Sequence, residues 1–166
     1  MAGFMTELQE IGAPRILELG TRRSIPEVQT LQKKHYPFAG EYIGTDIQPG
    51  IDVDVVSDVH RLSETFGVES FDAIISFSVF EHLKYPWLAA HEIMKTLRVG
   101  GHVFIGTHFV WHEHGYPYDY FRYTRDGLAA LFPRAMGVEV RWTEYQFPCV
   151  VQSETVQWNP AYQAFH

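Results

Sequence analysis

The chain has 166 residues, of which 46% are hydrophobic and 20% charged, and this composition predicts a single globular domain over residues 1–166. Its formal net charge of −7 argues against binding to nucleic-acid phosphates, and no apolar run approaches the roughly 20 residues that cross a bilayer, so neither nucleic acid nor a membrane is an expected partner. The single cysteine, Cys149, excludes an internal disulfide and a thiolate metal cluster, which favours a cytoplasmic protein.

Short apolar runs alternate with helical patterns along most of the chain, and buried parallel strands read as such near-continuous apolar runs. Strands are expected at 15–20, 41–47, 53–58, 71–78 and 102–107, with an edge strand at 138–145 and one more near 155–158. Helices are expected at 3–12, 26–34, 60–66, 87–97 and 126–131, the fourth of them ended by Gly100 and Gly101. This order predicts an α/β fold: a Rossmann-like, mostly parallel, seven-strand-type sheet with helices on both faces, a three-layer sandwich.

Three acidic residues close the first three strands: Glu18, Asp46 and Asp58. Ligands of open α/β sheets bind at the carboxyl ends of the strands, so these carboxylates are expected to line one crevice. Asp46, at the end of the second strand, is suited to accept two charge-assisted hydrogen bonds from a ribose diol. The alternative is that they are ordinary loop acids and helix caps, which is less favoured for three acids at successive strand ends.

The turn after the first strand contains one glycine, Gly20, followed by Thr21, Arg22 and Arg23. A dinucleotide fingerprint needs two further glycines so that the backbone can approach a pyrophosphate. Their absence disfavours NAD or FAD and therefore a nucleotide-binding oxidoreductase. A nucleoside without phosphates tolerates the bulkier turn.

Five segments of the chain resemble motifs of class I S-adenosylmethionine-dependent methyltransferases, of the small kind that share the type 11 methyltransferase domain. The segments are 16–20, 42–46, 57–59, 71–83 and 97–104, and the last two are the most specific. The resemblance runs from about residue 15 to residue 131. It implies a methyltransferase whose cofactor is S-adenosyl-L-methionine and whose partner is a small-molecule acceptor.

The resemblance also implies roles for single positions. Gly20 would let the backbone pass under the methionine part of the cofactor, and Glu18 would order the turn. Asp46 would bind the ribose hydroxyls and Asp58 would face the adenine amino group. The complete implied cofactor-binding set is Glu18, Gly20, Thr21, Asp46, Ile47, Asp58, Val59, Ser76 and Phe77. Two further motif positions, Glu81 and His82, are interpreted as structural residues at the start of a helix rather than as catalytic ones.

The segment 107–124 follows the fifth strand and is rich in histidine, aromatic and charged residues. It is expected to arch over the cofactor, and a hydroxyl acceptor there needs a base, most often histidine or a carboxylate. His114 or Asp119 is the expected catalytic base. The expected substrate-binding residues are His108, His112, Tyr118 and Arg122. Residues 114–122 resemble a loop of family members associated with glycan and other small-molecule O-methylation, so the acceptor is expected to be a sugar or another hydroxyl compound.

Other interpretations of this segment and of the whole chain stay open. His108, His112 and His114 could bind a divalent metal, but alternate positions in a loop fix no geometry, so no metal is expected. The aromatic residues could simply pack a lid, with Asp119 and Arg122 as a structural ion pair. The domain could also be degenerate and bind a nucleoside or a protein partner without turnover. A monomer or a homodimer is expected.

Overall fold

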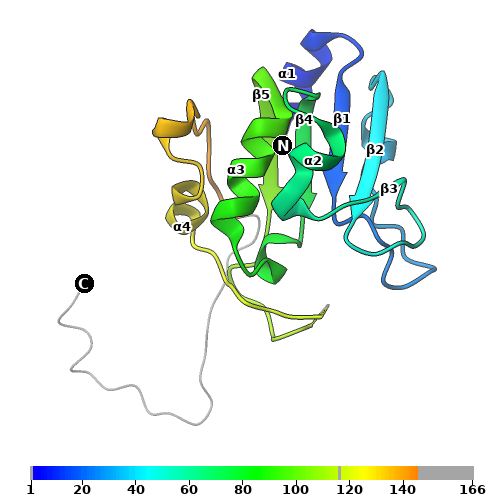
Figure 1. The fold of residues 1–166 in the computed structure, drawn as a ribbon, viewed down its shortest axis with the longest axis vertical. Helices are drawn as coiled ribbons and strands as arrows, with labels where there is room; N and C mark the ends of the chain where they lie inside the picture. The colour runs from blue at the N-terminus through cyan, green and yellow to red at the C-terminus, as the bar shows by residue number, and fades with distance from the viewer. Residues whose placement is uncertain (1, 116, 146–166) are drawn as a thin grey trace, which may run out of the picture.

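The computed structural model describes residues 2–115 and 117–145, and it contains one parallel sheet of five strands in the order β3-β2-β1-β4-β5 (Figure 1). The strands are β1 (Arg15–Leu19), β2 (Glu41–Asp46), β3 (Val55–Val56), β4 (Phe71–Phe77) and β5 (Leu97–Gly106). The helices are α1 (Ala2–Ile11), α2 (Leu62–Phe66), α3 (Pro86–Thr96) and α4 (Arg125–Ala130). Four 3-10 turns complete the elements: η1 (Lys33–His35), η2 (Val59–Arg61), η3 (Phe80–His82) and η4 (Arg134–Met136). None of the helices in this part of the chain has the length and apolar character that crossing a membrane requires.

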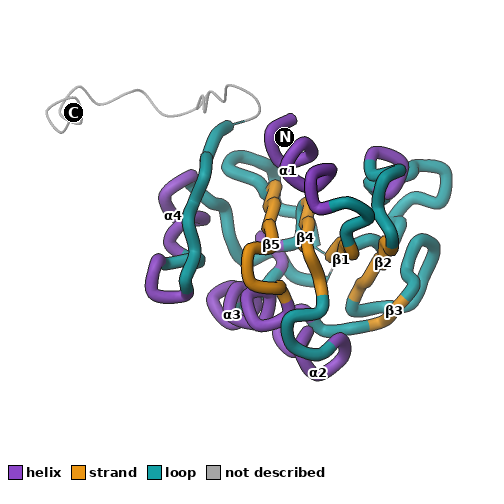
Figure 2. Tube along the Cα trace, turned by 90° about the horizontal axis from the view of Figure 1, so that it is seen from above, coloured by secondary structure: helices purple, strands orange, loops and turns teal. Residues whose placement is uncertain are grey.

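The sheet separates two apolar clusters, with α1 on one face and α2 and α3 on the other (Figure 2). Because side chains alternate along a strand, β1 contributes Ile16 to the cluster under α1 and Leu17 to the cluster under α2 and α3. The second cluster is the larger and includes Phe71 and Ile93. The expected Rossmann-like α/β architecture in three layers is confirmed, with five strands in the described residues.

Most of the expected elements are present because their apolar patterns match the burial that each position receives. The strand expected at 71–78 is β4, in which Phe71, Ala73 and Ile75 are fully buried. The helix expected at 87–97 is α3, which begins with Pro86 in its first turn, where proline suits a helix. The expected third strand is shorter than 53–58, since only Val55 and Val56 pair with β2.

The helix expected at 26–34 is absent, and only the three-residue turn η1 follows in that region. Long-range polar contacts fix this segment in another conformation. The Arg23 guanidinium donates to the Pro26 carbonyl and to Asp52, and the Gln32 amide donates to the Glu18 carboxylate. These contacts keep the chain between β1 and η1 in a non-helical conformation. The helix predicted at 26–34 from Pro26 and its apolar neighbours was therefore wrong.

Two further expectations about boundaries were wrong. Helix α3 ends at Thr96 and not at the glycines, because the amides of Glu69 and Ser70 take up the carbonyls of its last turn and the strand β5 then begins at Leu97. Gly100 and Gly101 therefore lie within β5. No strand forms at 138–145 in the described residues. Nearly every side chain of this segment is exposed, and the segment does not pair with either edge strand of the sheet. The strand expected near 155–158 lies outside the described residues.

The strand order places the switch point of the topology between β1 and β4. Both strands run parallel and pair directly, with Leu19 opposite Ser76 at their carboxyl ends. Just after β4, Ser78 has a φ of 53°, an uncommon backbone conformation that turns the chain into η3. The carboxyl ends of β1, β4 and β5 and the segments that follow them therefore meet at one edge of the sheet, where ligands of such folds bind.

Candidate functional site

The turn after β1 lies against the side chain of Val79, which follows β4, and two buried hydroxyls nearby are without partners among the described residues. Gly20 has a φ of +73°, and a Cβ atom there would lie 2.2 Å from the Val79 side chain, so only glycine fits. The buried hydroxyls of Thr21 and Ser76 have no hydrogen-bond partner in the described part of the chain. Buried polar groups usually find a partner, and of these two hydroxyls Ser76 lies at the switch point whereas Thr21 lies beside Gly44 of β2.

Asp46 ends β2 with its carboxylate partly exposed and fixed by two backbone amides. The amide of Arg22 donates to one carboxylate oxygen at 3.2 Å and the amide of Gln48 donates to the other at 3.0 Å. Its neighbour Ile47 is 61% exposed. The carboxylate therefore keeps lone pairs for further donors, as binding of a diol would require.

Glu18 differs from Asp46 because it is buried, with 3% of its surface exposed. The Tyr42 hydroxyl and the Gln32 amide both donate to its carboxylate, at 2.5 and 2.9 Å. Burial raises the pKa of Glu18 to about 6, although both hydrogen bonds oppose this shift. Glu18 thus orders the segment after β1, and its carboxylate does not face an open crevice.

Three other residues expected to bind the cofactor, Asp58, Val59 and Phe77, lie in different surroundings. Asp58 caps η2, accepting hydrogen bonds from the His60 amide at 2.9 Å and from the His60 ring at 2.7 Å, and its side chain is 40% exposed. Val59 packs against the cluster under α2 and α3. The Phe77 ring lies 5.3 Å from the Phe104 ring, on the other face of the sheet. Of the three acids, Asp46 alone combines partial exposure with a strand end, and Asp58 has the geometry of a helix cap.

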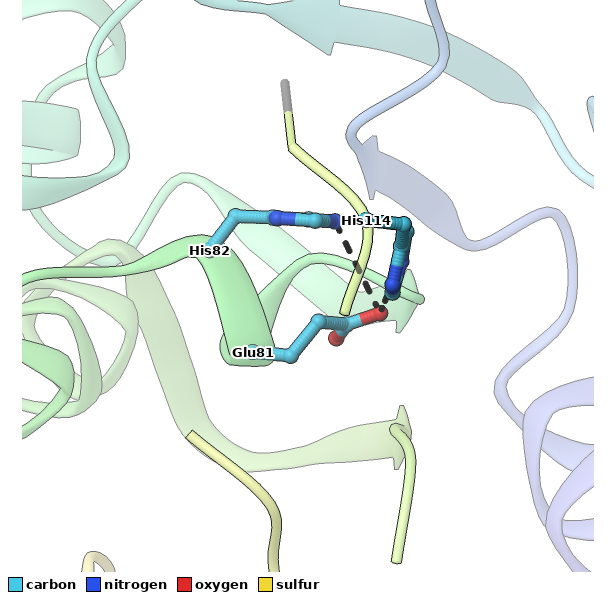
Figure 3. Close-up of side chains that lie close together, drawn as sticks. All are labelled: Glu81, His82 and His114. Carbon is cyan, nitrogen blue, oxygen red and sulfur yellow. Dashed lines mark ion pairs between the residues drawn. The ribbon is translucent and has the colours of Figure 1, made fainter. Parts of the chain in front are cut away.

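A second polar group surrounds Glu81, which is fully buried in η3 (Figure 3). The Thr107 hydroxyl donates to its Oε2 atom at 2.7 Å. Its Oε1 atom lies 2.6 Å from Nδ1 of His108, 3.8 Å from Nε2 of His82 and 3.9 Å from Nε2 of His114. The His108 contact is close but outside hydrogen-bond geometry, so Oε1 has no hydrogen-bond partner among the described residues.

The segment after β5 folds back over η3 through backbone hydrogen bonds. The amides of Tyr120 and Phe121 both donate to the Glu81 carbonyl, at 2.7 and 3.1 Å. The amide of Tyr123 donates to the His108 carbonyl at 2.9 Å and closes the loop at its base. These bonds bring His108 and His114 to the Glu81 carboxylate although the two elements are far apart in sequence.

Asp119 is held inside this loop by an ion pair. Both Asp119 oxygens accept hydrogen bonds from the Arg122 guanidinium, at 2.5 and 2.7 Å, and the His114 amide also donates to Asp119 at 2.8 Å. The Arg122 guanidinium, and then the His114 amide, hold the pKa of Asp119 well below its usual range. A carboxylate with so low a pKa is a weak base, so the geometry favours a positioning role: its Oδ2 lies 3.3 Å from Nδ1 of His114.

The structure brings together some of the residues expected to contact the acceptor and separates others. His108 and His114 share the Glu81 carboxylate, and Arg122 is engaged with Asp119 and with the His112 carbonyl. The side chains of His112 and Tyr118 are exposed. The sequence interpretation missed Glu81 and His82 as members of this group. Their position directly after the fourth strand, beside a histidine-rich segment after the fifth, was the available signal.

Comparison with known proteins identifies the kind of domain that this chain forms. A family model described as a methyltransferase domain matches residues 26–105, from before β2 almost to the end of β5. No curated protein matches the chain. A complex of the Haloferax volcanii Trm112 methyltransferase activator with a protein described as a "putative methyltransferase" gives a match that is 18% identical with a TM-score of 0.54. The alignment covers 82% of this chain and 69% of that chain, and at this identity the likeness supports the fold.

Two other solved structures are more distant. An S-adenosylmethionine-dependent methyltransferase from Mesorhizobium loti is 19% identical with a TM-score of 0.49, covering 69% of this chain and 55% of its own. The trans-methyltransferase CalH in complex with S-adenosylhomocysteine is 16% identical with a TM-score of 0.47, covering 61% of this chain and 34% of its own. The present chain thus spans only about a third to a half of the length of these two proteins. The methyltransferase domain matched over residues 26–105 and the fold of the described residues both support a class I S-adenosylmethionine-dependent methyltransferase.

Proposed function

We propose that the protein transfers a methyl group from S-adenosyl-L-methionine to a hydroxyl of a small polar acceptor, such as a sugar. The observation that carries this proposal is the buried Glu81 carboxylate, which gathers His82, His108 and His114 beside the ligand-binding edge of the sheet. A hydroxyl needs help to lose its proton, and histidine is the side chain that most often provides it. The net charge of −7 disfavours a nucleic-acid acceptor.

The cofactor side of the proposal uses the residues at the ends of β1, β2 and β4. Asp46 would accept hydrogen bonds from the ribose hydroxyls, since its carboxylate is partly exposed and fixed by amides. Gly20 lets the chain turn against Val79, and the unpartnered hydroxyls of Thr21 and Ser76 suit polar groups of the ligand. When bound, S-adenosyl-L-methionine supplies a methyl group on a sulfonium sulfur, which retains the electron pair of the broken bond.

The acceptor side uses the two imidazoles next to Glu81. His108 and His114 are placed to accept the acceptor proton, because each is partly exposed and each lies near the same buried carboxylate oxygen. Asp119 positions His114 by contacting its ring and its amide, and Arg122 holds Asp119 in place. Loss of the base at such a site lowers turnover by about 10²–10⁴-fold.

The cofactor assignment is tested by thermal unfolding with S-adenosylhomocysteine, which lacks the methyl group and cannot be consumed. A hundredfold excess over Kd stabilises the folded state by about 2.7 kcal/mol. For a chain of this size we expect a rise in Tm of about 5–10 °C. Asp46→Ala should lose most of this rise and melt near the wild-type temperature without ligand, and NAD should have no effect. A rise with NAD alone, or with neither compound, would contradict the proposal.

Turnover of a panel of hydroxyl acceptors tests the acceptor side. His114→Ala and Asp119→Asn should each lower turnover while the Tm rise with S-adenosylhomocysteine stays close to wild type. If both variants lose that rise, the loop serves cofactor binding or folding rather than the acceptor.

A further inference from the structure

We infer that Glu81, His82 and His114 form a binding site for a divalent first-row transition cation. The inference deepens the proposed function, on which its role in catalysis rests: the cation would hold the acceptor oxygen. The three side chains come from two segments, η3 and the loop after β5, and their donor atoms converge (Figure 3).

The separation of the donor atoms fits a single ion. One oxygen of Glu81 and one ring nitrogen each of His82 and His114 lie within 4.8 Å of one another, with the oxygen 3.8 and 3.9 Å from the two nitrogens. Ligands about 2.1 Å from a tetrahedral zinc ion lie about 3.4 Å apart. The two oxygen–nitrogen separations would have to shorten by about half an ångström and the widest pair by up to about 1.4 Å, a change of the size that side-chain rotations produce.

Both imidazoles present an unprotonated nitrogen to this point because their other nitrogens donate elsewhere. Nδ1 of His82 lies 2.6 Å from the Tyr118 carbonyl, and Nδ1 of His114 lies 3.1 Å from the His112 carbonyl. A carbonyl can only accept, so each Nδ1 carries a proton, and in the neutral ring that binds a metal this leaves the lone pair on Nε2. Such outer contacts fix the tautomer and the ring orientation of metal-binding histidines.

The carboxylate is oriented in the same way. Thr107 occupies Oε2 of Glu81, and Oε1 faces the two Nε2 atoms and, at 2.6 Å, Nδ1 of His108, without a contact of hydrogen-bond geometry in the described residues. Three lone pairs directed at one point repel each other, and burying a carboxylate without compensation is costly. A bound divalent cation would offset both the repulsion between the lone pairs and the cost of burying the carboxylate. Two imidazoles and one carboxylate favour a transition metal over magnesium or calcium.

The environment leaves room for a further ligand on the cation. Glu81 is fully buried, whereas the side chains of His82 and His114 are 15% and 21% exposed. The open side would take the acceptor oxygen, whose pKa a bound cation lowers. In this arrangement His114 binds the cation, and the hydroxyl proton passes to His108. The oxygen keeps both electrons of the former O–H bond.

Cobalt binding to the full chain after dialysis against a chelator tests the inference without cofactor or acceptor. We expect one equivalent of Co²⁺ per chain by titration of its visible absorption, displaced by Zn²⁺. His82→Ala and His114→Ala should each weaken Co²⁺ binding by more than the roughly 10–100-fold that changes in outer contacts cause. His91→Ala, an exposed position on α3, and His112→Ala, an exposed position in the loop, should bind as wild type does.

A Glu81→Gln variant, which removes a fully buried carboxylate, could fail to fold. The test therefore relies on variants of the two partly exposed histidines. Wild-type binding no tighter than that of the His82→Ala, His114→Ala double variant would overturn the inference. Loss of binding in His112→Ala with retention in His82→Ala would overturn it in favour of a site within the loop. A chain that shifts its Tm with S-adenosylhomocysteine but binds no Co²⁺ refutes the metal site alone. A chain that binds Co²⁺ without that Tm shift supports the metal site and contradicts the proposed function.

Discussion

Glu18 and Glu81 are both buried glutamates, one on β1 and one just after the neighbouring β4, yet their surroundings differ. The Glu18 carboxylate accepts hydrogen bonds from the Tyr42 hydroxyl and from the Gln32 amide, and Tyr36 packs beside it in an apolar cluster. The Glu81 carboxylate accepts a hydrogen bond at one oxygen and faces imidazoles at the other. Burial alone therefore does not mark a reactive carboxylate; the unused lone pairs and the kind of neighbour do.

The segments that follow the two strands differ in the same way. The chain after β1 is fixed by polar contacts in which each group is paired with another group of the protein, such as Arg23 with Asp52 and Gln32 with Glu18. The loop after β5 is fixed by the Arg122–Asp119 ion pair and by amides on the Glu81 carbonyl, and it leaves imidazole nitrogens directed at the carboxylate. Contacts of the first region support the fold, and contacts of the second hold the residues of the proposed acceptor site in place.

Substituting each glutamate by glutamine gives the largest contrast. Glu81→Gln should lower turnover by about 10²–10⁴-fold, because both the imidazole pair and the inferred cation lose their carboxylate. Glu18→Gln should keep turnover within a few fold, since an amide oxygen can still accept from Tyr42 and Gln32. Steady-state rates with one acceptor, together with circular dichroism to confirm folding, measure the difference. Equal losses in the two variants would remove the distinction between the two glutamates.

The features that the sequence predicted correctly are those that local pattern decides. The apolar runs of β4 and the apolar stripe of α3 reflect burial that every position in the segment shares. The end of β2 at Asp46 was also predicted, and its role in cofactor binding stays a prediction that rests on the position of strand ends at the ligand edge of such sheets. Residue type and position along a strand are sufficient for inferences of this kind.

The features that the sequence did not predict depend on partners far along the chain. The segment 26–34 has a proline suited to a helix start, but Glu18 accepts from the Gln32 amide and Arg23, itself paired with Asp52, donates to the Pro26 carbonyl. These contacts hold the segment in another conformation. Glu81 and His82 were interpreted as structural residues because nothing in their own segment indicates that His108 and His114 will lie beside them. The order of the two segments after neighbouring strands hinted at the group, but only the folded loop shows which side chains meet.

The hydroxyls that hold the two carboxylates form the next matched pair. Tyr42→Phe and Thr107→Val each remove one hydrogen bond from a buried carboxylate, so each should lower the free energy of unfolding by about 1–3 kcal/mol. Only Thr107→Val should also weaken Co²⁺ binding, by about 10–100-fold, because Thr107 orients the Glu81 carboxylate. Urea unfolding and cobalt titration of the same samples measure both effects. Weaker cobalt binding in Tyr42→Phe would show that the two regions are coupled.

The pH dependence of stability isolates Glu18. Burial raises its pKa from 4.5 to about 6, so the folded state binds this proton more tightly than the unfolded state does. The stabilisation is complete below about pH 4.5 and is lost as the pH rises to about 6, a change of about 2 kcal/mol. Relative to wild type, Glu18→Gln should therefore gain about 1.3 kcal/mol between pH 4.5 and 6, and about 2 kcal/mol over the whole titration.

The quantity to compare is the difference in free energy of unfolding between Glu18→Gln and wild type, because other carboxylates make both proteins less stable as the pH falls. Asp72, Glu92 and Asp119 have lowered pKa values, so their contributions are lost as the pH falls. Those contributions are common to wild type and variant and cancel. Urea unfolding at pH 4.5, 5.2, 6 and 7 provides the measurement. A difference that stays constant across this range would mean that Glu18 does not titrate there.

The smallest expected effect concerns the far end of the loop after β5, where Thr124 caps α4 by accepting a hydrogen bond from the Gly127 amide at 3.0 Å. Thr124→Ala should lower the free energy of unfolding by about 1 kcal/mol, as loss of a helix cap commonly does, and Thr124→Ser should retain the cap. Co²⁺ binding should not change, because the loop is held by the Arg122–Asp119 ion pair and by the amides on Glu81 rather than through α4. Cobalt binding weakened as strongly as in His82→Ala would show instead that the helix positions the loop, and with it His114.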